Sequence, residues 1–258
     1  MGFWESIMAE FVALQAAKEA IPLSTQLLHD FYQSFIEGDR WLMYVKGVGV
    51  TLQVTVAALI LGTALGVLIA VVRSLHDQQR LGHRNPVLGF FNGLCKLYTT
   101  VIRGTPMMVQ LLIIYFVIFA GTRNQIGVAM LAFGINSGAY VSEIIRGGLM
   151  SVDPGQMEAG RSLGLNYLNT MRFIVVPQAV KNILPSLGNE LITLLKETSI
   201  VTVIGLVDLT KAAILVQSKA YQALMPFIAI ALVYLAMVML LTWLLGILER
   251  RLRQSDKR

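Results

Sequence analysis

The stretch EAGRSLGLNYLNTMRFIVVP, residues 158–177, separates segments that are apolar enough to cross a membrane. It begins with polar residues and carries two glycines, at positions 160 and 164. A water-soluble protein gains nothing from such an insert, whereas a membrane subunit that is driven by another protein needs a defined contact outside the bilayer. The stretch therefore predicts a membrane protein with a docking element for a partner.

Local signals predict a first short helix at the start of this insert. Asp153 suits an N-cap, Pro154 suits the first helical turn, and Gln156 suits the return position of a capping box. The helix should run to Leu163 and stop at Gly164, because glycine adopts the left-handed C-cap conformation at the least cost.

A second short helix should follow, with Asn166 as its N-cap. Its apolar positions are Leu168, Met171, Phe173 and Ile174. Pro177 should interrupt this helix, since proline lacks a backbone N–H. The insert is thus predicted to form two short helices that are joined at a glycine elbow and project from the membrane.

Composition places the chain among multi-spanning membrane proteins. Of its 258 residues, 55% are hydrophobic and only 14% are charged, and the mean hydropathy is +0.66. A water-soluble domain does not bury so much apolar surface. The net charge of +6 does not indicate nucleic-acid binding, because the basic residues lie between and after the apolar segments. The single cysteine, Cys95, excludes an intramolecular disulfide framework.

The apolar segments predict an all-α fold with about five transmembrane helices. A spanning helix needs about 20 apolar residues to cross a hydrocarbon core of roughly 30 Å. The segments are residues 47–72, 106–120, 125–145, 183–207 and 223–246. Between the first two, residues 85–103 should form an amphipathic helix at the membrane interface. Pro106 should occupy the first turn of the short second span.

Small residues recur along one face of the first span. They are Ala58, Gly62, Gly66 and Ala70. Such a stripe lets another helix approach closely. Two interpretations are open: close packing inside one subunit, or contact with a second subunit.

Basic residues set the expected orientation, because cytoplasmic loops carry an excess of Lys and Arg. Those on the side of the insert are Arg73, Arg80, Arg84, Lys96, Arg103, Arg146, Arg161, Arg172, Lys181, Arg250, Arg251, Arg253, Lys257 and Arg258. Fewer lie on the other side, namely Arg40, Lys46, Arg123, Lys211 and Lys219. The insert and the C-terminus should therefore be cytoplasmic and the N-terminus outside.

The same pattern divides the chain into three parts. Residues 1–44 should form an external amphipathic extension, since charged residues interrupt their apolar positions too often for a span. Residues 45–250 should form the transmembrane domain, in which the insert, here named the coupling loop, occupies about residues 150–182. Residues 251–258 should be a basic cytoplasmic tail.

Polar residues gather on one face of the fourth predicted span. At 100° per residue, an arc of roughly 120° contains Ser186, Asn189, Glu190, Thr193, Lys196 and Glu197. An ionisable group near the bilayer centre costs about 2.5 to 3.5 kcal/mol, so it should face a partner or water. All of these except Ser186 are candidates for lining a translocation path. The alternative is that the charges only hold the helix bundle together.

A second polar face lies on the third span, where Asn136, Tyr140 and Glu143 are spaced at i, i+4 and i+7. Glu143 precedes Arg146 by three residues and lies near the cytoplasmic end of the span. We expect it to form a structural salt link rather than a contact with a transported molecule.

The sequence carries no motif for catalysis. It lacks the Gly-x-x-x-x-Gly-Lys-Ser/Thr phosphate loop, so an ATPase would have to be another chain. The three histidines, His29, His76 and His83, are not spaced like a metal site. We therefore expect no catalytic residue, no cofactor and no metal, and we do not expect an enzyme.

The coupling loop resembles the EAA loop of the membrane subunits of ABC importers. That pattern reads Glu-Ala-Ala, three residues, Gly, nine residues, Ile, one residue, Leu-Pro. The matching positions are Glu158, Ala159, Gly164, Ile174 and Pro177. Gly160 replaces the second alanine and Val176 replaces the leucine. The resemblance implies that this segment, with Gly160 included, couples the chain to an ATPase.

Other stretches resemble the polar amino-acid branch of these permeases, the histidine, glutamate, glutamine and arginine type. They are residues 49–52, 103–106, 142–148 and 195–199. The resemblance runs from about residue 47 to the C-terminus and leaves the N-terminal extension uncovered. It implies five core spans with an external N-terminus, in the cytoplasmic membrane of a prokaryote.

The resemblance also implies partners and a mechanism. The importer would combine two permease subunits, two cytoplasmic ATPases and an external solute-binding protein. Closure of the ATPases would push on the coupling loop and switch the permeases between inward-facing and outward-facing states. Lys196 could then meet the carboxylate of a zwitterionic amino acid, and Glu190 or Glu197 its ammonium group.

Three alternatives remain open at this point. One is a secondary transporter or channel, against which the spacing of the coupling loop argues. Another is an ABC permease for a different solute, since a few pocket residues and the binding protein determine specificity. A membrane scaffold without transport is the third. The identity of the amino acid, and whether the second permease is a copy of this chain or a homologue, are also open.

Overall fold

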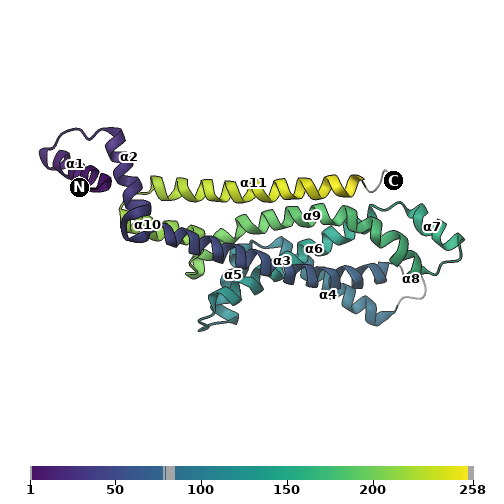
Figure 1. The fold of residues 1–258 in the computed structure, drawn as a ribbon. Coiled ribbons are helices and arrows are strands. Elements are labelled where there is room, and N and C mark those ends of the chain that lie inside the picture. The colour runs from purple at the N-terminus through teal and green to yellow at the C-terminus, as the bar shows by residue number, and fades with distance from the viewer. Residues whose placement is uncertain (1, 78, 80–84, 255–258) are drawn as a thin grey trace.

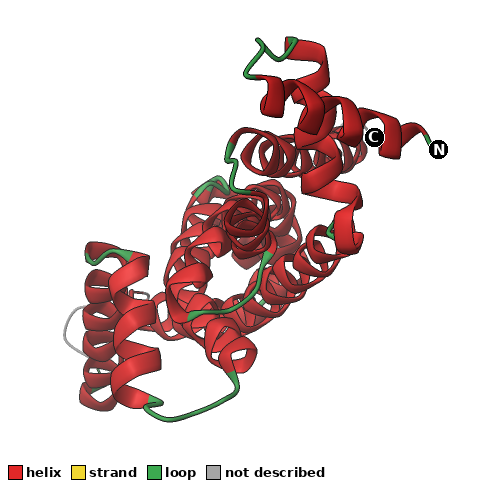
Figure 2. Cartoon of the chain, turned by 90° about the vertical axis from the view of Figure 1, so that its left-hand side faces the viewer, coloured by secondary structure: helices red, strands yellow, loops and turns green. Residues whose placement is uncertain are grey.

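The computed structural model describes residues 2–77, 79 and 85–254. Within these residues the chain forms helices and loops without a strand (Figure 2). The α-helices are α1 Phe3–Ala17, α2 Leu23–Phe31, α3 Trp41–Asp77, α4 Pro86–Gly104, α5 Met107–Ile113, α6 Gln125–Met150, α7 Pro154–Ser162, α8 Tyr167–Thr170, α9 Val176–Glu197, α10 Leu209–Ala220 and α11 Leu224–Gln254. Shorter π- and 3₁₀-helical turns are η1 Tyr32–Ile36, η2 Glu37–Asp39, η3 Ile114–Ile118, η4 Met171–Val175 and η5 Thr198–Ile204.

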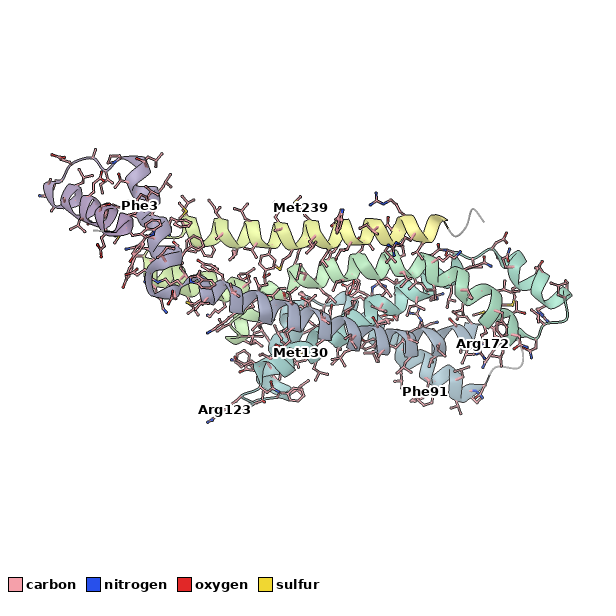
Figure 3. The ribbon with its side chains drawn as sticks, in the orientation of Figure 1. Phe3, Phe91, Arg123, Met130, Arg172 and Met239 are labelled. Carbon is pink, nitrogen blue, oxygen red and sulfur yellow. The ribbon has the colours of Figure 1, made fainter. Side chains whose placement is uncertain are left out.

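The helices form an elongated bundle in which α3, α6, α9 and α11 run along the long axis (Figure 1). Helices α1 and α2 lie at one end, which we name the arm end. Helices α7 and α8 lie at the other, which we name the loop end. Phe3 and Arg172 mark these opposite ends (Figure 3). The predicted coupling loop is therefore separated from the N-terminal extension by the length of the bundle.

The expectation of about five spans agrees with the helices. Within the described residues, α3, α6 and α11 are each long and apolar enough to cross a membrane. Two further spans result if bent pairs are counted as single crossings. In one pair the break lies between Gly104 and Met107, with an angle of 109°, and in the other it lies between Ile204 and Leu209, with an angle of 51°.

The prediction for the second span was wrong in two respects. The helical segment of residues 107–118 is only about 18 Å long at 1.5 Å per residue, so it is too short to cross a core of roughly 30 Å alone, and it is long enough only if α4 is counted with it. Pro106 is the N-cap of α5 with extended backbone angles rather than a residue of its first turn. Thr105 before it is also extended, as residues that precede proline usually are, and the helical axis breaks at this point. The helix predicted at residues 85–103 is present as α4, and its place at the membrane interface stays a prediction.

Helices α3 and α6 pack closely through the predicted stripe of small residues. A Cβ atom added to Gly62 would lie 2.7 Å from the Cβ of Ser137, and one added to Gly66 would lie 2.7 Å from Cγ1 of Val141. The glycines of α6 do the same for α3, since a Cβ on Gly134 would lie 2.8 Å from the Cβ of Leu61. The stripe thus serves packing inside one subunit, the first of the two interpretations.

The N-terminal arm, residues 2–40, is fixed to the arm end of the bundle through η1. Phe35 packs on a buried cluster that includes Tyr44 of α3 and Leu209 of α10. The side-chain amide of Gln222 donates to the hydroxyl of Ser34 and accepts from the N–H of Met225, 3.1 Å away. The base of the arm is therefore held by three helices, while α1 and α2 stand beyond them (Figure 1).

Candidate functional site

The start of the coupling loop follows the predicted capping pattern with one difference. The Oδ1 atom of Asp153 accepts a hydrogen bond from the N–H of Gly155 at 2.8 Å, and Pro154 is the first residue of α7. Gln156 does not complete the capping box. Its side-chain oxygen instead accepts from the amide of Gln178 at 3.2 Å, which links the beginning of α7 to α9.

The predicted glycine elbow is present. Helix α7 ends at Ser162, with Leu163 as its C-cap, and Gly164 has a φ of +83°. No atom lies within 4 Å of a Cβ placed on Gly164. The backbone conformation, rather than a lack of space, therefore requires glycine here. Asn166 caps α8 by accepting from the N–H of Asn169 at 2.8 Å, as predicted.

Gly160 lies where the two short helices cross. It is buried, and a Cβ on it would lie 2.5 Å from Cγ2 of Thr170 and 3.0 Å from Cδ1 of Ile174. The hydroxyl of Thr170 is engaged with the carbonyl of Asn166 at 3.0 Å, so this side chain has little freedom to move. The replacement of the alanine of the EAA pattern by Gly160 thus has a steric cause in this chain.

Pro177 does not interrupt the second helix, contrary to the prediction. Helix α8 continues through the π-helical turn η4 into α9, and Pro177 is the second residue of α9. The widened turn directly precedes the proline, where an α-helix would lack one hydrogen bond and would meet the proline ring. The elements from Tyr167 to Ile204 consequently follow one another without a loop.

The outer surface of the coupling loop is partly apolar. Leu163 is 81% exposed and Leu168 is 70% exposed, and both lie beside the elbow. Glu158 and Ala159 are exposed on α7. Exposed apolar side chains that gather into a patch are a feature of protein–protein contacts. The surface lies at the extreme loop end (Figures 1 and 3).

The polar residues of α9 divide into two groups. Asn189, Thr193 and Lys196 are exposed and form one continuous stripe at spacings of four and three residues. Glu190 instead faces α6, where its Oε1 atom accepts from the hydroxyl of Ser137 at 2.8 Å. The structure therefore does not bring all five candidates together.

Two further polar residues of α9 lie next to this stripe or continue it. Glu197 is half-buried beside it. Asn182, which the sequence interpretation omitted, continues the stripe toward the loop end, and its amide donates to the hydroxyl of Ser151 at 2.8 Å. Its spacing of seven residues from Asn189 was the signal that could have identified it.

Glu143 forms the expected structural ion pair. Its carboxylate pairs with Arg73 of α3, a buried residue, and lies 4.0 Å from Arg103 of α4. The nearby Arg146 pairs with Asp77 at 3.6 Å instead. Charged side chains thus join α3, α4 and α6.

A buried carboxylate that the sequence interpretation missed lies at the opposite end. Asp208 is fully buried and accepts from the N–H groups of Thr210 at 3.1 Å and Lys211 at 2.9 Å. It is the N-cap of α10. The signal was present, because an aspartate directly before a helical segment is a frequent N-cap.

Residues 86–254 match the family model described as "Binding-protein-dependent transport system inner membrane component". A putative glutamine transport system permease protein of Rickettsia bellii is 40% identical over 214 residues, which is 82% of this chain and 93% of that protein. An arginine transport system permease protein of Bacillus subtilis is 38% identical over 215 residues, with the same shares of 82% and 93%.

Comparison with solved structures leads to the same family. The crystal structure described as "an amino acid ABC transporter with histidines" has 41% sequence identity and a TM-score of 0.73, and the match covers 81% of this chain and 94% of that one. An inward-facing methionine ABC transporter has a TM-score of 0.66 at 16% identity, which supports the fold alone. Membership in this family implies an ATPase and a substrate-binding protein as partners, and a transport component of the cell membrane rather than an enzyme. The chain therefore belongs to the binding-protein-dependent transport system inner membrane components, the permease subunits of ABC importers.

Proposed function

We propose that this permease moves polar amino acids across the cytoplasmic membrane and that the exposed polar stripe of α9 lines their path. The stripe is the observation that carries the proposal. Lys196 belongs to a membrane helix yet is exposed in the single chain. Contact with lipid would cost about 2.5 to 3.5 kcal/mol for one such charge near the bilayer centre. The stripe therefore faces a second permease subunit across a polar path.

The chemistry of the stripe suits an amino acid. The ammonium of Lys196 can pair with the carboxylate of a zwitterion, and the half-buried Glu197 can pair with its ammonium group. Glu190 is the weaker candidate because the hydroxyl of Ser137 already engages it. Asn189 and Thr193 add neutral hydrogen-bonding groups to the same stripe. The relatives named for glutamine and arginine transport support this class of solute.

The coupling loop is the proposed contact with the ATPase. The residues assigned to this role are Glu158, Ala159, Gly160, Gly164, Ile174 and Pro177. Helix α7 presents the exposed surface, and the tight crossing at Gly160 joins it to η4. Because η4 continues into α9 without a loop, a push on α7 would move the polar stripe directly. This supports alternating access driven by the partner ATPase.

The assembly follows from these surfaces. Two permease subunits would meet along α9, and an ATPase dimer would bind their coupling loops on the cytoplasmic side. The arm end would then lie outside, where the solute-binding protein delivers the amino acid. Lipid would cover α11, from which Met239 points away from the bundle (Figure 3).

A pull-down from native membranes in mild detergent tests the docking role. We expect the parent chain to recover an ATPase and Gly164→Asp to lose it, because aspartate at a φ of +83° strains the elbow and adds a charge to the docking surface. Gly121→Asp is the matched control. Gly121 has the same φ of +83° and equally open surroundings, but it lies in the turn before α6, away from the loop end.

Two results would contradict the proposal. Loss of the ATPase from Gly121→Asp as well would mean that general misfolding, rather than the elbow, explains the effect. Failure to recover any ATPase with the parent chain, in detergent that keeps a known importer intact, would favour a secondary transporter.

A further inference from the structure

A cavity of about 380 Å³ lies at the loop end, between the coupling loop and the ends of α3 and α6. We name it the sub-loop pocket. Its floor is formed by Leu149, Met157 and Met171, which pack on the buried cluster around Val175. Small-molecule sites in proteins have volumes of about 300 to 1,000 Å³ and mostly apolar walls. The pocket fits that description.

The charged groups of the sub-loop pocket include both signs. They are Asp77 of α3, Arg146 of α6 and Asp153 before α7. Arg146 and Asp77 are 3.6 Å apart, longer than the roughly 2.7 to 2.9 Å of a close charged hydrogen bond. Both side chains are also partly exposed. The other oxygen of Asp77 lies 3.6 Å from Nδ1 of His76, also longer than a hydrogen bond. Donors on Arg146 and acceptors on Asp77 therefore remain available to a third group.

We propose that the sub-loop pocket binds a free amino acid from the cytoplasm. Its α-carboxylate would pair with Arg146 and its α-ammonium with Asp77 or Asp153, while the carbon atoms of its side chain lie on the methionines of the floor. A simple anion would leave the two carboxylates of the rim without a partner and a simple cation would leave Arg146 without one, whereas a zwitterion supplies a group of each sign. None of the residues that line the pocket belongs to the polar stripe of α9, so this site is distinct from the proposed transport path.

A ligand at this place would restrain the coupling loop. Asp153, Met157 and Met171 belong to the loop, whereas Asp77 and Arg146 belong to the membrane helices. A molecule that bridges the two groups resists any movement of α7 relative to α3 and α6. The inference rests on the proposed function for that movement, and it predicts that cytoplasmic amino acid slows ATP-driven transport.

Proteoliposomes that contain the complete importer with its ATPases facing outward test this inference. The solute-binding protein and its solute are enclosed, and L-arginine or L-glutamine is added outside at millimolar concentration. We expect the solute-stimulated ATP hydrolysis to fall about fivefold, at the lower end of typical allosteric couplings. Agmatine, which is arginine without its carboxylate, should have no effect, because Arg146 then has no partner.

Variants locate the effect. The quantity compared is the ratio of the hydrolysis rates with and without the added amino acid, because a ratio is independent of changes in the basal rate. This ratio should approach one in Arg146→Gln. Arg172→Gln is the matched control, since this exposed arginine of the same loop does not line the pocket. Met150→Trp should also abolish the response, because Met150 is 70% exposed at the pocket and a larger side chain would fill its mouth.

Three outcomes would overturn the inference while leaving the proposed function intact: no response to either amino acid, an equal response to agmatine, or an unchanged response in Arg146→Gln. If solute never stimulates hydrolysis, the proposed function fails. In that case, equilibrium dialysis of labelled L-arginine and L-glutamine against the purified complex tests whether the pocket binds an amino acid. Binding of either by the parent and not by Arg146→Gln supports it, and equal or absent binding overturns it.

Discussion

Single residues in the coupling loop have identifiable reasons for their identity. Gly164 is required by its backbone angle and Gly160 by the side chains that surround it. The first requirement is local, so the sequence predicts it. The second depends on Thr170, ten residues further along the chain, whose methyl group fills the space that an alanine would need. Only the folded arrangement reveals that Gly160 and Thr170 are a matched pair.

This pairing predicts a compensated substitution. Gly160→Ala should destabilise the crossing of α7 and η4 by about 1 to 3 kcal/mol, the usual cost of overpacking. Adding Thr170→Ser should restore most of the loss, because serine removes the methyl group and keeps the hydroxyl that bonds to Asn166. Thermal unfolding of the two variants and of Thr170→Ser alone measures the coupling. Additive effects in the double variant would refute the pairing.

At the scale of elements, the features that depend on neighbours in sequence were predictable. The caps at Asp153 and Asn166 and the elbow at Gly164 follow from short-range hydrogen bonds and backbone preferences. The two prolines were misjudged. Proline removes one N–H in every context, but the chain responds with a break at Pro106 and with a π-helical turn before Pro177.

Other features could not be predicted because they depend on contacts between residues that are far apart in the sequence. Glu190 belongs to the polar arc by its angle on the helix, yet Ser137 of α6 draws it away from the exposed stripe. Glu143 was expected to form a salt link, and its partner, Arg73, lies 70 residues earlier. Neither pairing leaves a periodic signal in the chain.

The N-terminal arm allows a prediction at the same scale. Gln222→Ala should loosen the arm, because the amide of Gln222 connects Ser34 of η1 to the start of α11. Hydrogen exchange of the amides in α2 and η1 should become faster, while exchange in α6 stays unchanged. Gln217→Ala on α10 serves as the control. Unaltered exchange in α2 and η1 would mean that the packing of Phe35 alone holds the arm.

At the scale of the whole molecule, the bundle exposes two different kinds of membrane surface. Helix α11 is apolar and little buried in the chain, as expected of a helix in contact with lipid. The stripe of α9 is polar, and its residues Asn189, Thr193 and Lys196 are exposed. These are the two surfaces that the proposed function assigns to lipid and to a second permease subunit.

Site-specific photo-crosslinking distinguishes these surfaces. A benzophenone amino acid in place of Thr193 should capture a second permease subunit, whether a copy of this chain or a homologue. The same probe in place of Trp243, which is 59% exposed on α11, should capture none. Mass spectrometry of the products identifies the partner. Capture of a permease from position 243 but not from position 193 would reverse the assignment of the two surfaces.

The interlocked glycines of α3 and α6 have a mechanical consequence. Gly62 and Gly66 on one helix and Gly134 and Gly138 on the other bring the two backbones so close that neither helix can slide without a steric clash. The α3–α6 pair should therefore stay fixed during transport, and on the proposed function the segment from Tyr167 to Ile204, whose elements follow one another without a loop, is the part that moves. Substitutions at the α3–α6 contact should therefore change the thermal stability of the protein. Substitutions between Tyr167 and Ile204 should instead change the amount of solute transported per ATP hydrolysed.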